Sequence, residues 1–147
     1  MPGAIAIMQA GPGDLAAVLA IDDRPDRATD VSEAIVSGRC LIAKIDGGIA
    51  GFCVGGTFFG HDFLELLIVA EYRRRQGVGA ALVEAFAARV STTKVFTSTN
   101  ASNAPMRALC ERLGFVQAGT IDHLDEGDPE VVYVRLRSGA AAPEPAS

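Results

Sequence analysis

The chain has 147 residues, of which 49% are apolar and 21% are charged, a composition typical of one globular domain and too apolar for a wholly disordered chain. Its formal net charge of -5 repels polyanions, which argues against a nucleic-acid binder that neutralises phosphates. The longest apolar run, residues 66–70, is far below the roughly 20 residues needed to cross a bilayer, so no membrane partner is expected.

The cysteines and the first residues predict a cytoplasmic protein without a metal site. Cys40, Cys53 and Cys110 are odd in number, widely spaced and without a CxxC pair, which favours reduced thiols over a disulfide framework or a zinc site. Only His61 and His123 could add imidazole ligands. No basic region followed by an apolar stretch opens the chain, so no secretory signal is evident.

The first half of the sequence predicts a strand, two helices and a hairpin. Residues 5–7 alternate as a weak strand, and two amphipathic helices follow, one led by Asp14 and one over about residues 29–37. Residues 40–45 and 49–57 are rich in β-branched and apolar residues. The sequence Asp46-Gly47-Gly48 between them supplies the positive φ that a hairpin turn needs.

The second half begins with a nearly continuous apolar run, Phe63 to Ala70, which is typical of a central strand buried on both faces. Glu65 is its one interior charge. A helix over about residues 78–91 and a strand over residues 94–98 are expected next.

After that strand, Ser102 or Asn103 can cap a helix that Gly114 ends. Two final strands, 115–121 and 131–136, flank an acidic loop. The tail, residues 138–147, consists of small residues and proline and is expected to be disordered.

The junction after the apolar run has the chemistry of a phosphate site. Arg73, Arg74 and Arg75 precede Gly77-Val78-Gly79, which opens a helix. Backbone N–H groups at a helix start have no partner within the helix, and arginine suits phosphate oxygens. A dinucleotide fingerprint would require glycine at Leu82, and no G-K-[ST] follows for a Walker loop. The sequence therefore predicts a ligand that carries a phosphate ester.

Two segments resemble the GCN5-related N-acetyltransferase (GNAT) superfamily. Arg74, Gly77 and Gly79 match its acetyl-CoA loop, [RQ]-x-x-G-x-[GA]. The segment from Asn103 to Phe115 is similar to its second motif, a helix-opening asparagine followed by L-[YC]-E-x-L-G-F. The order of predicted elements over residues 5–136 is also that of the family.

The resemblance implies an α/β (α+β) single domain over residues 1–137 with the acyl-CoA N-acyltransferase fold: a mixed, mostly antiparallel, splayed sheet of about seven strands flanked by about four helices. It implies acetyl-CoA as cofactor, with CoA as product, and a homodimer is common in the family. The residues that it assigns to the cofactor are Leu67, Ile68, Val69, Arg74, Arg75, Gln76, Gly77, Val78, Gly79, Ala80 and Asn103. Glu71 and Arg75 replace a frequent proline and a frequent glycine of the loop.

Amine acetylation needs a base, and Glu65 is the candidate because burial would raise its pKa and the family often places a glutamate on this strand. The alternative is that Glu65 faces solvent or pairs with an arginine. Cys110 stands where the family has a tyrosine proton donor, although a cysteine on an apolar helix face is more often a packing residue. Tyr133 or a water would then substitute.

The acceptor is expected to be a primary amine of a small molecule or peptide. The acidic loop, residues 122–130, would attract a cationic acceptor unless it is a solvated turn, whereas Arg24 and Arg27 would suit an acceptor with a carboxylate. The alternative function is a catalytically weak acyl-CoA-binding sensor or partner module of the same fold.

Overall fold

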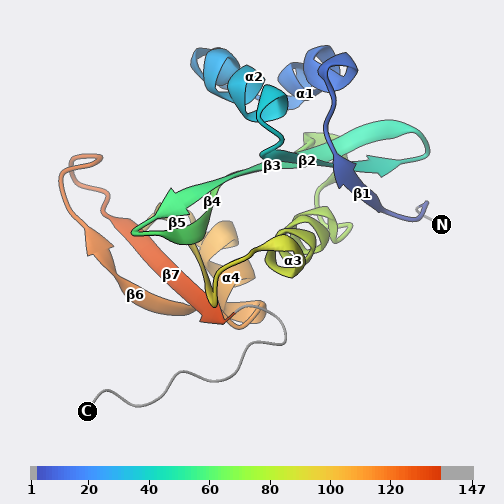
Figure 1. Ribbon diagram of the computed structural model, residues 1–147. Helices are drawn as coiled ribbons and strands as arrows, with labels where there is room; N and C mark the ends of the chain where they lie inside the picture. The colour runs from blue at the N-terminus through green and yellow to red at the C-terminus, as the bar shows by residue number, and fades with distance from the viewer. Residues whose placement is uncertain (1–2, 137–147) are drawn as a thin grey trace. The chain divides into compact units, whose positions relative to one another are not determined.

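The structure is a computed structural model that describes residues 3–136, so the tail predicted to be disordered lies outside the described residues. The elements are, in chain order, β1 (Ala6–Gln9), η1 (Pro12–Asp14), α1 (Leu15–Ile21), η2 (Pro25–Arg27), α2 (Ala28–Val36), β2 (Cys40–Ile45), β3 (Gly48–Phe58), β4 (His61–Val69), η3 (Glu71–Arg73), α3 (Val78–Arg89), β5 (Lys94–Asn100), α4 (Ala104–Arg112), β6 (Val116–Ile121) and β7 (Glu130–Leu136) (Figure 1). The strands form one sheet in the order β1-β2-β3-β4-β5-β7-β6.

The predicted fold class is confirmed for the described residues: seven strands in one sheet, accompanied by four α-helices. The pairs β1–β2, β2–β3, β5–β7 and β6–β7 are antiparallel. Chain contacts divide the protein into two compact units, residues 1–56 with 64–86 and residues 57–63 with 87–147. No helix in the part of the chain that the structure describes is long and apolar enough to span a membrane.

In the first unit, α1 and α2 cover one face of β1, β2 and β3, and α3 covers the other (Figure 1). Val18 of α1 and Val31 of α2 are fully or almost fully buried and belong to one cluster with Ile42 and Phe52 of the sheet. Removing this apolar surface from water stabilises the layer by roughly 25 cal/mol per Å².

Glycines on β3 allow α3 to approach the sheet closely. A Cβ on Gly51 would lie 2.8 Å from the Ile68 carbonyl oxygen and 3.0 Å from Cγ1 of Val78. A Cβ on Gly55 would overlap the Phe86 ring of α3. Val78 and Leu82 are buried as the four-residue spacing predicts.

The hairpin turn between β2 and β3 is confirmed. Asp46 and Gly47 both have positive φ, 51° and 82°, which is the backbone of a type I′ turn. This turn matches the twist of the two strands it joins, so the local sequence was enough to predict it.

The strand β4 differs from the prediction of a strand buried on both faces. Its apolar run is correctly placed, but only Leu64 is buried, the residues around it are half-buried and Glu65 is exposed. The prediction is wrong because a cavity opens along this strand and is lined by Glu65 and Leu66.

In the second unit, β7 lies between β5 and β6. Residues on β5 alternate, with Val95, Thr97 and Thr99 buried, and they pair with β7 in antiparallel register. β6 lies at the edge of the sheet, and all six of its residues are exposed. The order follows from long-range pairing that the local sequence does not specify.

Candidate functional site

The arginine-rich loop has a backbone conformation suited to a helix start that faces an anion. After η3, Arg74 is extended, Arg75 has a φ of 64° and Gly77 has a φ of 83°, and α3 begins at Val78. Positive φ is rare for a residue with a side chain, so Gly77 is the residue type that this turn favours.

The first amides of α3 are available to a ligand. Ala81 N donates to Gly77 O at 3.0 Å, and within the described residues no acceptor is found for the N–H groups of Val78, Gly79 and Ala80. Unpaired amides and the helix dipole together give such an end partial positive charge. The predicted phosphate cradle therefore has the required donors.

Space and charge around the loop also fit a polyphosphate. A Cβ built on Gly77 would meet nothing within 4 Å, so the backbone can be approached closely there. Arg74 and Arg75 are exposed and have no ion-pair partner among the described side chains. Arg73 instead lies over the Tyr72 ring, 5.6 Å from its centroid, and donates to Gln76 Oε1 at 3.4 Å.

The strand that leads into the loop is partly accessible. Leu67, Ile68 and Val69 are half-buried, and Ala70 N donates to Ala50 O at 2.8 Å, which ties the end of β4 to β3. The predicted cofactor residues from Leu67 to Ala80 thus form one continuous segment of the first unit.

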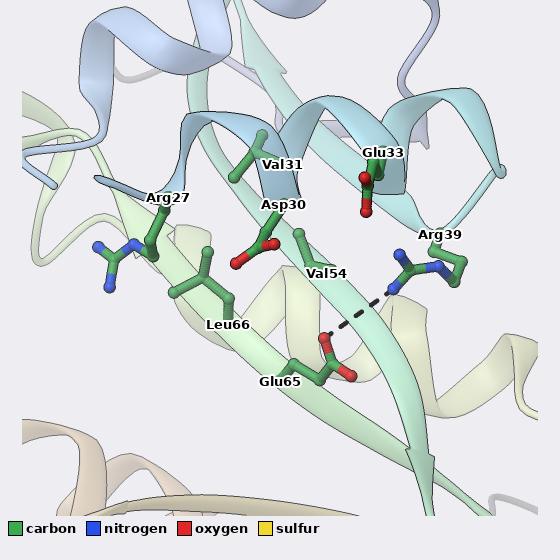
Figure 2. A pocket seen from close by; sticks show the side chains of 8 residues that line it. All are labelled: Arg27, Asp30, Val31, Glu33, Arg39, Val54, Glu65 and Leu66. Carbon is green, nitrogen blue, oxygen red and sulfur yellow. Dashed lines mark ion pairs between the residues drawn. The ribbon is translucent and has the colours of Figure 1, made fainter. Parts of the chain in front are cut away.

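A cavity of about 350 Å³ lies over the same strand, between α2, β3 and β4 (Figure 2). This volume is in the range of small-molecule sites. Its lining residues are Arg27, Asp30, Val31, Glu33, Arg39, Val54, Glu65 and Leu66.

Both arginines of the cavity are already paired. Arg27 makes two hydrogen bonds with the Asp22 carboxylate, at 2.7 and 3.2 Å, and they contribute to the lowered pKa of Asp22 although partial burial opposes it. Arg39 faces Glu65 at 3.9 Å. Asp30 and Glu33 have no ion-pair partner among the described residues, so the uncompensated charge of the cavity is negative.

Glu65 has the second of its two predicted environments, in which the side chain faces solvent or pairs with an arginine. Its side chain is 45% exposed and it pairs with Arg39, so the predicted burial of Glu65 is wrong. The carboxylate is directed into the cavity, with Asp30 above it and Arg39 beside it (Figure 2). A carboxylate at this position is accessible to a molecule in the cavity.

The other predicted site residues, Asn103, Cys110 and Tyr133, belong to the second unit. Asn103 caps α4, its Oδ1 accepting from Met106 N at 3.2 Å. Cys110 is 2% exposed, and burial raises the pKa of its thiol to about 11. Tyr133 is fully buried, and its hydroxyl accepts from Arg107 Nε at 3.1 Å. Of the three catalytic candidates, Glu65 alone is solvent-accessible.

The acidic loop has local partners that the sequence did not reveal. Asp128 accepts from both the amide and the hydroxyl of Ser102, and Asp125 accepts from Asn100 Nδ2. These bonds fix the loop to the end of β5. They support the solvated-turn interpretation over an acceptor-attracting role.

Sequence reasoning missed three charged residues of the cavity, Asp30, Glu33 and Arg39, and the glycine at position 56 beside Glu65. Asp30 and Glu33 carried a usable signal, because residues three apart lie on one face of a helix. Arg39 and Gly56 carried none: the first follows a helix end and the second is one of several glycines in a strand. Gly56 lies beside Glu65 because β3 and β4 are neighbours in the sheet, and Arg39 reaches it through its hydrogen bonds with Gly55 of β3.

Comparisons with known proteins agree with the geometry. A family model described as an acetyltransferase (GNAT) domain matches residues 36–117. A GNAT-family acetyltransferase from Bacillus cereus is 34% identical, with a TM-score of 0.88 over 92% of this chain and 99% of that one.

Two more distant solved structures share the fold. The ribosomal-protein-S18-alanine N-acetyltransferase of Escherichia coli is 22% identical, with a TM-score of 0.76 over 98% of this chain and 99% of that one. A Salmonella typhimurium protein solved with its cofactor acetyl-CoA is 18% identical, with a TM-score of 0.73 over 98% of this chain and 100% of that one. Among curated proteins, none matches the sequence significantly.

Proposed function

Because the chain belongs to the GNAT acetyltransferase family, we propose that it binds acetyl-CoA at the arginine loop and transfers the acetyl group to an amine held in the cavity beside Glu65. The observation that carries the proposal is the loop itself. Free amides at the start of α3, the open space at Gly77 and the exposed Arg74 and Arg75 converge on one segment.

Each part of the loop has a defined task in cofactor binding. The amides of Val78, Gly79 and Ala80 donate to the diphosphate, and Arg74 and Arg75 neutralise its charge. The C-terminal end of β4, Leu67 to Val69, holds the pantetheine arm through its main chain. When bound, the cofactor supplies an activated acetyl thioester, and the protein supplies position and proton transfer.

The chain's own contribution to the chemistry is proton transfer at Glu65. The acceptor's neutral amine nitrogen bonds to the acetyl carbon as the carbon–sulfur bond breaks, and Glu65 Oε accepts the proton that the nitrogen loses. The leaving thiolate of CoA takes its proton from water in this scheme. Cys110 is then a packing residue, consistent with its burial and with a raised pKa that disfavours its thiolate.

The charge of the cavity favours a cationic acceptor. Arg27 is neutralised by Asp22, so it is not free to bind an acceptor carboxylate, whereas Asp30 and Glu33 are free to attract an ammonium group. The acceptor class that fits is a primary amine of a small molecule or peptide with positive charge near the reacting nitrogen. Homodimerisation and a cytoplasmic location stay predictions.

One observation favours a second candidate, a binding module with weak catalysis. Tyr133 and Cys110 are both buried, so neither is an exposed proton donor in the described chain. Proximity alone can nevertheless supply much of the acceleration in a transfer between two bound molecules, so we favour the enzyme.

The test measures release of CoA with a thiol reagent over a panel of amines: diamines, polyamines, amino acids and peptide amino termini. All three cysteines of the chain are buried, so the protein's own background signal should be low. Sustained turnover on any acceptor supports the enzyme, highest for dicationic amines. Tight acetyl-CoA binding in calorimetry without turnover on the panel would support the binding module instead.

A further inference from the structure

Glu65 lies against a strand position where any side chain would displace its carboxylate. A Cβ built on Gly56 of β3 would overlap Oε1 of Glu65 and lie 2.5 Å from its carboxyl carbon. The nearby Gly55 has a different reason to be glycine, because a Cβ there would meet the Phe86 ring of α3. The missing side chain at Gly56 is thus the space that the Glu65 carboxylate fills.

Arg39 holds the same carboxylate from the other side. Its Nη1 donates to Gly55 O at 2.8 Å, and its Nε donates to Ser37 Oγ at 2.9 Å. These two anchors direct the guanidinium to Glu65 Oε2, 3.9 Å from Nη1 (Figure 2). Arg39 is therefore attached to the strand that carries Gly56, and both contacts act on one side chain.

The ion pair between Arg39 and Glu65 is not explained by stability. The side chains of Arg39 and Glu65 are 41% and 45% exposed, and an ion pair this accessible contributes little to folding. A long acidic side chain on a strand open to solvent samples several rotamers unless neighbours restrict it. Arg39 favours the rotamer that faces the cavity, and Gly56 leaves the space that this rotamer needs.

We propose that Arg39 and Gly56 are positioning residues that hold the Glu65 carboxylate toward the acceptor in the cavity. The inference rests on the proposed function, in which Glu65 is the base. Arg39 and Gly56 act through Glu65, so their loss should lower kcat while leaving the affinity for acetyl-CoA unchanged.

The test compares Gly56→Ala, Arg39→Gln, Arg39→Lys and Glu65→Gln with the wild type. Displacing a catalytic group by about 1 Å can cost 10²-fold, so we expect Gly56→Ala to lower kcat on the order of tenfold to a hundredfold. Arg39→Gln should lower it less, and Arg39→Lys should restore part of the loss by keeping the charge. Gly48→Ala, on the same strand, is the matched control, because its Cβ would meet only Ile45 O at 3.7 Å.

Two further measurements separate positioning from a folding defect. Thermal unfolding and the calorimetric affinity for acetyl-CoA should be near wild type in Arg39→Gln, even if Gly56→Ala is less stable. Adding Gly56→Ala or Arg39→Gln to Glu65→Gln should lower kcat no further, because no base remains to be misplaced.

The outcomes distinguish this inference from the proposed function. An active wild type whose Gly56→Ala and Arg39→Gln variants keep full kcat overturns the positioning role and leaves the function standing. Full turnover in Glu65→Gln overturns the base and the positioning role together. A wild type that neither binds acetyl-CoA nor releases CoA overturns the proposed function itself.

Discussion

Replacing Gly77 by alanine should separate the loop's role in binding from its role in folding. Gly77 has a φ of 83°, and a Cβ there would meet no protein atom within 4 Å, so the substitution creates strain but no clash. A left-handed residue with a side chain costs roughly 1–2 kcal/mol, of which a part is offset by lower entropy of the unfolded chain. The expected net loss is about 1 kcal/mol, or about 4 °C in Tm.

The loss of affinity should exceed this strain. The new methyl group projects into the open space through which a diphosphate would approach the α3 amides. A hydrogen bond to a charged group contributes about 1.5–3 kcal/mol, so losing one should raise the Kd for acetyl-CoA about tenfold to a hundredfold.

Gly47→Ala is the matched control for calorimetry and thermal unfolding. Gly47 has a φ of 82° and equally open surroundings, but it lies in the β2–β3 turn. Both variants should lose similar stability, and only Gly77→Ala should lose affinity for acetyl-CoA. Equal affinities in the two variants would refute the assignment of the α3 start as the diphosphate site.

Three other predictions concern the remaining structure. Asn103→Ala should lower the free energy of unfolding by about 1 kcal/mol in urea denaturation, and Asn103→Asp should not, because aspartate also caps helices. Equal losses in the two variants would contradict the role of Asn103 as the cap of α4. Asp62→Ala should lower the free energy of unfolding by about 1–3 kcal/mol, because Oδ2 of Asp62 accepts hydrogen bonds from the amides of Ser91 and Thr92. Asp62→Asn keeps one acceptor oxygen, so it should lose less stability. Burial raises the pKa of Cys40 and Cys110 from 9.0 to about 11, so the thiols of the unfolded chain ionise first and stability should fall as pH rises from about 9 to 11. In the double alanine variant, the Tm measured by thermal unfolding should fall less over this pH range. An unchanged dependence of Tm on pH would count against this linkage.

Local sequence was enough to predict the features whose backbone geometry depends on neighbouring residues. Asp46-Gly47 predicted the hairpin because positive φ is a property of the residues in the turn. The spacing of Val78 and Leu82 predicted the buried face of α3. Ser102 or Asn103 was expected to cap α4, and Asn103 does so. Gly77 predicted the turn that precedes α3 for the same reason.

Tertiary structure alone decided the surroundings of Glu65. The apolar run around it suggested burial, but exposure depends on which elements cover a strand, and here a cavity opens beside it. Arg39 and Gly56 lie 26 and 9 positions before Glu65 in the chain, and no local pattern connects them to it. The neighbouring strands β3 and β4 place Gly56 there, and hydrogen bonds with Gly55 of β3 place Arg39 there. Strand pairing is a long-range choice that minimises the free energy of the whole sheet rather than of one segment.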